Sequence, residues 1–211
     1  QVKWAQDQSP VKIMEKSRRI GISYAEAADD VLYAASAEGA NVYYISYNKE
    51  MTSGFIQDCA TWARAFNAAA SQIEESVIEE EDKQILTYTI KFDSGHMIQA
   101  FTSSPRNLRS KGRPGERLVV DEGAFLDDIK EVLKAAMAMT MWGGQIRIIS
   151  THDGDDNPFN ELINDVRAGK FPYSLHRVDL DDALRDGLYK KICAVTGLEW
   201  SKEREVEWRQ T

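Results

Sequence analysis

Asp121 and Glu122 form the acidic pair with the most specific chemistry in this chain, because they directly follow an apolar run, 118–120. A carboxylate pair that ends a buried strand can hold Mg²⁺ through the first group and polarise an attacking water through the second. The same pair could also be an exposed Asp-Glu at the start of a helix. We favour the catalytic interpretation because a second motif lies upstream, also where a strand is expected to end.

That second motif is the segment 16–23, KSRRIGIS, between an expected strand and an expected helix. It follows the phosphate-binding pattern GxxxxGK[ST] only in part. Gly21 and Ser23 match, whereas Ile22 replaces the lysine and Lys16 replaces the first glycine. Such a loop needs backbone N–H groups at a helix N-terminus, a hydroxyl for Mg²⁺ and a cation, and the long side chain of Lys16 could supply the cation. The alternative is a basic turn that binds no ligand.

Ser150 and Thr151 place polar side chains at the end of a third apolar run, 146–149. A polar residue at this place could sense the terminal phosphate from a neighbouring strand, and we assign that role to Thr151. Ordinary polarity at a strand end is the alternative explanation.

The segment 102–117 is the strongest basic cluster, with four Arg and Lys111 against Glu116, a net charge of +4. Such a loop could contact DNA, or it could supply an arginine finger to the nucleotide of a neighbouring subunit. Arg109 is our first candidate for the finger and Arg113 the second. A solvated loop without either role is the alternative.

Composition limits the class of protein. The chain has 211 residues, 43% of them hydrophobic, and a net charge of −8. These values exclude a disordered chain and argue against a histone-like DNA coat, although a local basic patch remains compatible. Only Cys59 and Cys193 occur, so neither a disulfide framework nor a CxxC zinc site is expected. We expect no membrane helix, and because the chain begins at Gln1 we expect it to be part of a longer protein.

The elements that must position these residues alternate between strands and helices. Strands are expected at 10–15, 42–47, 85–92, 97–101, 118–121, 146–149 and 173–178, and helices at 24–37, 49–71, 127–139 and 157–168. This alternation predicts a three-layer α/β fold with a largely parallel sheet, in which residues 76–101 add a small antiparallel part. Polar clusters that follow the strands would then meet at the carboxyl edge of the sheet, where ligands bind.

Taken together, the motifs resemble the ATPase domain of the tailed-phage large terminase, and most closely its Mu-like subgroup. KSRRIGIS resembles the variant Walker A loop with its lysine at the beginning, LVVDEGAF resembles the Walker B motif, and IISTHDG resembles the coupling motif. The resemblance implies a P-loop fold of the ASCE type and ATP and Mg²⁺ as cofactors. It also implies that the adenine-binding glutamine of the family is Gln1 or Gln6.

The site implied by these motifs has three parts. Glu122, Arg109 and Thr151 are the expected catalytic residues, and Ser23 and Asp121 the expected Mg²⁺ ligands. The expected nucleotide-binding residues are Gln1, Lys16, Ser17, Arg18, Arg19, Ile20, Gly21, Ile22 and Ser23.

The resemblance further implies the setting in which the protein works. Residues 1–180 would form the ATPase domain, and residues 181–211 a helical segment leading toward a nuclease domain that these 211 residues do not include. We therefore expect no DNA cleavage by this chain. The implied partners are double-stranded DNA, the portal protein, the small terminase subunit and further copies in a ring, expected to be a pentamer, on the procapsid in the host cytoplasm. The isolated chain could be a monomer with slow turnover and weak DNA binding.

Two rival interpretations stay open, and a third is weak. A helicase-like translocase shares the core but needs a second RecA-like domain. A nucleotide-binding protein that does not hydrolyse is the other rival, because Ile22 stands in place of the usual lysine. A metal-dependent nuclease built from Asp121, Glu122 and Asp153 explains the residues less well than ATP does.

Overall fold

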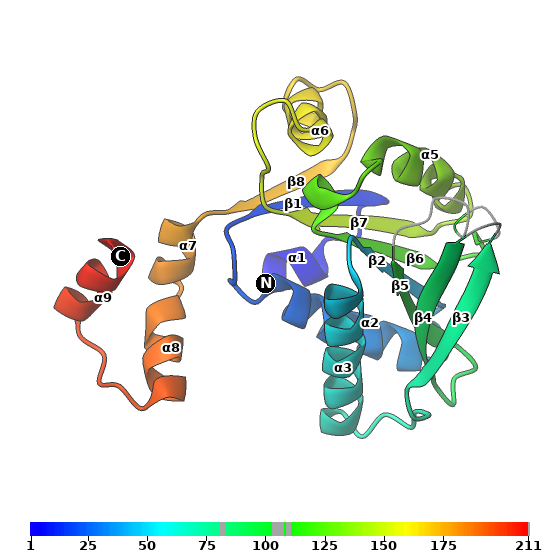
Figure 1. Ribbon diagram of the computed structural model, residues 1–211, viewed down its shortest axis with the longest axis horizontal. Coiled ribbons are helices and arrows are strands. Elements are labelled where there is room, and N and C mark those ends of the chain that lie inside the picture. The colour runs from blue at the N-terminus through cyan, green and yellow to red at the C-terminus, as the bar shows by residue number, and fades with distance from the viewer. Residues whose placement is uncertain (81–82, 103–107, 109–110, 211) are drawn as a thin grey trace.

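An eight-stranded sheet forms the centre of the computed structural model, which describes residues 1–80, 83–102, 108 and 111–210 (Figure 1). The strands are β1 (Val11–Lys16), β2 (Val42–Ser46), β3 (Glu74–Glu80), β4 (Lys83–Lys91), β5 (Met97–Thr102), β6 (Arg117–Asp121), β7 (Gln145–Ser150) and β8 (Ser174–Val178). Helical segments are α1 (Val2–Gln6), α2 (Ile22–Ala35), α3 (Lys49–Ala65), η1 (Gly123–Phe125), α5 (Ile129–Thr140), α6 (Pro158–Arg167), α7 (Leu180–Arg185), α8 (Leu188–Thr196) and α9 (Lys202–Gln210).

The strand order is β3-β4-β5-β2-β6-β7-β1-β8, and all neighbouring pairs from β5 to β8 are parallel. Strand β7 therefore separates β1, which leads into the candidate phosphate loop, from β6, which ends in Asp121. The carboxyl ends of β1, β2, β6 and β7 lie at one edge of the sheet, as expected for parallel strands joined by helical crossovers. The expected α/β fold with a mostly parallel sheet is confirmed.

Two apolar layers hold the helices on the sheet. Helices α2 and α3 cover one face, while α5 and α6 cover the other (Figure 1). Alternation within β6 shows how one strand serves both layers, since Val119 packs in the α2–α3 layer while Leu118 and Val120 pack in the α5–α6 layer. Both faces of the parallel strands are thus covered, which explains why their sequences are apolar almost without interruption.

A buried network of charges joins α2 to the sheet. Arg147 of β7 is fully buried, and its guanidinium lies 2.8 Å from the Glu26 carboxylate and also pairs with Asp29. Arg117 of β6 adds ion pairs of 3.3 Å to Asp29 and 3.6 Å to Asp30. Because α2 follows the candidate phosphate loop directly, this network fixes the helix on which that loop depends.

The structure corrects two expectations for the segment between α3 and β6. Helix α3 ends at Ala65 rather than near residue 71, because Phe66 leaves the helix and Asn67 takes a left-handed conformation with φ 52°. The antiparallel part is the hairpin of β3 and β4, whereas β5 pairs antiparallel with β4 and parallel with β2. Strand β5 thus belongs to the main sheet, and β3 forms the sheet edge.

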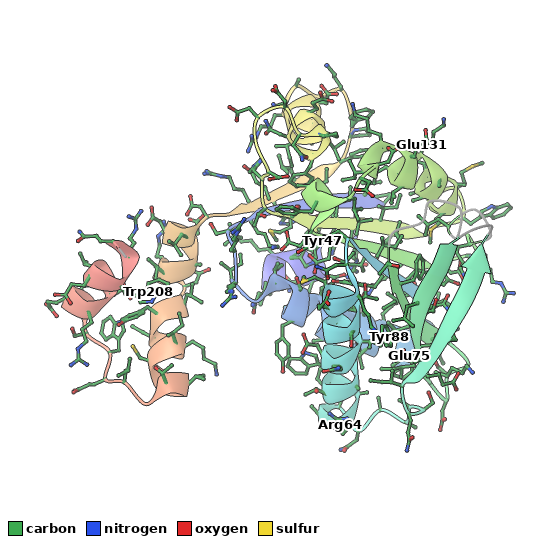
Figure 2. All side chains as sticks on the ribbon, in the orientation of Figure 1. Tyr47, Arg64, Glu75, Tyr88, Glu131 and Trp208 are labelled. Atoms are coloured by element: carbon green, nitrogen blue, oxygen red, sulfur yellow. The ribbon has the colours of Figure 1, made fainter. Side chains whose placement is uncertain are left out.

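Helices α7 to α9 lie to one side of the sheet and form a small cluster of their own (Figure 1). In Figure 2, Trp208 of α9 faces α8, where its ring centroid lies 5.2 Å from that of Tyr189. Arg209 and Asp181 add a bidentate ion pair between α9 and α7. The proposed division at residue 180 stays a prediction. Among the described residues, no helix has the length and apolarity that crossing a bilayer requires.

Candidate functional site

The loop between β1 and α2 borders a cavity of about 500 Å³ at the carboxyl edge of the sheet. Gly21 is the N-cap of α2 and has φ 75°, a left-handed conformation that favours glycine. A glycine cap brings no side chain to the N–H groups of the first helical turn, so these groups can donate hydrogen bonds to an anion. The cavity is lined by Lys16, Arg18, Arg19, Ile20, Gly21, Ile22, Ser23, Tyr24, Tyr47, Met51, Glu122, Phe125 and Thr151.

Most of the expected loop residues therefore line the cavity, but Ile22 does so differently from the motif and Ser17 does not line it. The Ile22 side chain is only 3% exposed and packs in the α2–α3 layer, so this residue can offer its backbone N–H rather than a cation. Ser17 turns toward β8, where its N–H donates to the Val178 carbonyl at 2.9 Å. The side-chain amide of Gln1 donates to the Gly21 carbonyl at 3.1 Å, which places it beside the loop.

Lys16 forms an ion pair with Glu122. The Lys16 Nζ lies 2.6 Å from Glu122 Oε1, and the two side chains are 5% and 17% exposed. The candidate phosphate-binding cation and the candidate catalytic carboxylate thus neutralise each other across the cavity floor. Thr151 completes this group, since its N–H and its hydroxyl each lie 3.4 Å from Glu122 Oε2.

Asp121 is fully buried beneath the cavity. It accepts hydrogen bonds from Tyr44 Oη at 2.9 Å, from the Glu122 N–H at 2.9 Å and from the Ser23 hydroxyl. Burial raises the pKa of Asp121, although the Ser23 hydrogen bond and the positive charge of Lys16 act in the opposite direction. A buried carboxylate beside a hydroxyl is a hard-oxygen donor set that suits Mg²⁺ completed by phosphate and water oxygens, so these residues fit the implied metal.

Arg109 lies outside the described residues. Arg113 is exposed, and its N–H donates at 2.8 Å to the Glu116 carboxylate, at the amino end of β6. Strand β6 has five residues, so roughly 13 Å separate that end from the carboxyl edge. Arg113 is therefore remote from the cavity of its own chain.

Sequence reasoning missed Tyr44, which holds Asp121, and Tyr47, which lies on the cavity wall where β2 ends (Figure 2). The signal for Tyr44 was present, because a tyrosine inside a central strand requires a partner for its hydroxyl. A second cavity of about 240 Å³ lies between α5 and α6, and its lining is mainly apolar.

Two curated relatives match nearly the whole chain, whereas no family model matches it. Over 99% of its length, the chain is 52% identical to the "Mu-like prophage FluMu protein gp28" of Haemophilus influenzae and covers 41% of that protein. It is 48% identical, again over 99% of its length, to the "Probable terminase, large subunit gp28" of Escherichia phage Mu and covers 39% of it. The chain thus spans about two fifths of these relatives.

Solved structures support the fold. The large terminase of a thermophilic bacteriophage in complex with ADP matches 97% of this chain and 45% of its own, with a TM-score of 0.59 and 14% identity. The large terminase ATPase domain of Thermus phage P74-26 matches 90% of this chain and 84% of its own, with a TM-score of 0.54 and 16% identity. At these identities the similarity concerns the fold.

Proposed function

Because this chain is a homologue of the Mu-like gp28 proteins over nearly its whole length, we propose that it is the ATPase part of a large terminase and hydrolyses ATP to move double-stranded DNA into procapsids. The observation that carries this proposal is the group of Lys16, Glu122 and Thr151 at the floor of the cavity, beside a helix N-terminus that can accept an anion. The group combines a cation for phosphate, a carboxylate for water and a polar residue that touches this carboxylate.

Each residue then has a defined task. Lys16 and the N–H groups of residues 21–23 bind the phosphates, and Arg18 and Arg19 add positive charge at the cavity wall. Ser23 and Asp121 would hold Mg²⁺, which neutralises charge on the phosphate oxygens when bound. Glu122 orients the attacking water and accepts its proton once Lys16 has turned to the phosphates.

Thr151 would report the state of the nucleotide. The N–H and the hydroxyl of Thr151 contact Glu122 Oε2. A movement of Glu122 on loss of the terminal phosphate would therefore be transmitted to Thr151 and to β7, which directly precedes it. The role of Gln1 in adenine binding is supported by its position beside Gly21.

The wider setting is part of the same proposal. The motor would work in the host cytoplasm with the portal, the small terminase subunit and further copies in a ring, expected to be a pentamer. In a ring, an arginine of one subunit can act on the nucleotide of its neighbour. The distance of Arg113 from the cavity of its own chain supports such a role. Arg109 remains the first candidate for the arginine finger.

Turnover with Mg-ATP tests the proposal directly. We expect slow phosphate release by the isolated chain and faster release with DNA and portal present. Glu122→Gln should abolish release while nucleotide still binds, whereas Lys16→Ala should weaken binding itself. A wild-type protein that binds ATP but shows no turnover even with DNA, portal and full-length partner would instead establish the non-hydrolysing alternative, which the burial of Ile22 favours.

A further inference from the structure

The turn that follows Asp121 holds Glu122 in an uncommon backbone conformation. Glu122 has φ 51° and ψ 46°, in the left-handed region that a residue with a side chain rarely adopts. The turn continues as η1, in which the Phe125 N–H donates to the Glu122 carbonyl at 2.9 Å. A strained conformation of this kind persists only when its surroundings hold it, so the contacts of η1 decide where the Glu122 carboxylate points.

Ala124, at the centre of η1, is held from both sides. Its N–H donates to Ser150 Oγ of β7 at 3.0 Å, and its carbonyl accepts from the side-chain amide of Asn157 at 2.8 Å. Ala124 is only 5% exposed, so solvent does not replace these partners easily. The turn is thus fixed to Ser150, the last residue of β7, which directly precedes Thr151, and to the start of α6.

Asn157 uses both ends of its amide. While the nitrogen donates to Ala124, the oxygen accepts the Phe159 N–H at 2.9 Å and so caps α6. Asp at this position could cap the helix but has no donor for the Ala124 carbonyl, and Ser could cap it but has no second polar atom. The double contact therefore requires an amide side chain. A helix cap alone does not require one, because Ser, Thr and Asp can also cap a helix.

We propose that Asn157 is a positioning residue for Glu122 in the hydrolysis of ATP. It acts through Ala124 and η1 and is not one of the residues that line the cavity, and this inference rests on the proposed function. Asn157 holds the carboxylate in the place from which it can orient water after Lys16 has moved away.

Asn157→Asp separates this role from that of a helix cap. The variant keeps the cap of α6 and loses the donor to Ala124. We expect kcat for Mg-ATP to fall about 10- to 100-fold, because small displacements of a catalytic group cost this much. The KM for ATP and the affinity for a non-hydrolysable ATP analogue should stay close to the wild-type values, whereas the Tm should fall by a few degrees because the Ala124 carbonyl loses a buried donor.

Asn160→Asp is the matched control on the same helix. The Asn160 amide also donates to a backbone carbonyl, that of Asp155 at 2.9 Å, so this variant makes the same chemical change away from η1. Its kcat should equal the wild-type value. Hydrogen exchange of the segment 122–126 supplies a readout that needs no turnover, and it should become faster in Asn157→Asp but not in Asn160→Asp.

The outcomes are distinguishable. Unchanged exchange at 122–126 in Asn157→Asp, or faster exchange with unchanged kcat, overturns the positioning role. An equal loss of kcat in Asn160→Asp, or a loss of kcat in Asn157→Asp that is matched by a loss of nucleotide affinity, overturns it as well. If the wild-type protein hydrolyses nothing, the proposed function fails, whereas the exchange experiment still reports whether Asn157 holds the turn.

Discussion

Replacing Glu122 by Gln should make nucleotide bind more tightly while it stops hydrolysis. In the structure the Glu122 carboxylate holds the Lys16 ammonium at 2.6 Å, with little exposure of either side chain. Incoming phosphates must therefore compete with Glu122 for Lys16 and also approach a negative charge. Glutamine removes that charge but keeps an oxygen that can accept a weaker hydrogen bond from Lys16.

The magnitude can be bounded from the geometry. At this separation and an effective dielectric constant near 20, the attraction between the two charges is on the order of 6 kcal/mol. Most of it is offset by the cost of desolvating the pair, and the glutamine retains part of the contact. A net gain of about 1.4 kcal/mol for a triphosphate is a reasonable expectation, which corresponds to about tenfold tighter binding.

Titration with a fluorescent nucleotide, in competition with a non-hydrolysable ATP analogue, ADP and AMP, measures this gain. The gain should be largest for the triphosphate and smallest for AMP, and it should shrink as salt rises. Glu161→Gln is the matched control, because Glu161 pairs with Lys130 at the same distance of 2.6 Å on an exposed surface far from the loop. Equal or weaker triphosphate binding by Glu122→Gln would show that Lys16 is not the cation that phosphates recruit.

Three further predictions concern the supports of the site. Arg147→Met should lower the free energy of unfolding, measured with urea, by about 3–5 kcal/mol, because it leaves the buried Glu26 carboxylate unpaired; a loss below about 1 kcal/mol would contradict this reasoning. Burial raises the pKa of Glu116, but hydrogen bonds from the Gly112 N–H and other donors outweigh burial and lower this pKa overall. The contribution of Glu116 to stability is therefore present above the unfolded pKa of about 4.5 and is lost as pH falls through the lower folded pKa. Glu116→Gln should therefore flatten the acid limb of stability against pH, and an unchanged limb would refute the assignment. Tyr44→Phe keeps the ring but removes a hydrogen bond to Asp121, and it should cost about 1–2 kcal/mol in urea unfolding, with no cost expected only if water replaces the hydroxyl.

Sequence patterns predicted the parts of this site that depend on chain direction. Asp121 ends a strand of the parallel sheet, while Thr151 and the phosphate loop each follow one, and such positions meet at one edge whatever the details of packing. The same rule explains the place of Arg113. A segment that precedes a parallel strand must return to the amino edge, so four residues before β6 the chain is already far from its own cavity.

Other features depend on side-chain placement that periodicity does not contain. Lys16 was expected to reach the phosphate region, but its pairing with Glu122 depends on the left-handed turn after Asp121. Asn157 was visible only as the start of a helix, because its second contact joins it to a turn 33 residues away in the chain. Strand β5 was grouped with an antiparallel addition because only tertiary pairing shows that its other neighbour is β2.

Strand β3 has a consequence for solubility. As one of the two outermost strands of the sheet, β3 leaves one row of backbone N–H and carbonyl groups without a neighbouring strand, and such a row can recruit another chain and start aggregation. Its sequence, EESVIEE, contains four glutamates, and Glu74 and Glu75 are exposed. Figure 2 labels Glu75 on this strand. Two copies that approached edge to edge would bring these like charges together. Copies of this protein should therefore not associate by pairing one β3 edge with another.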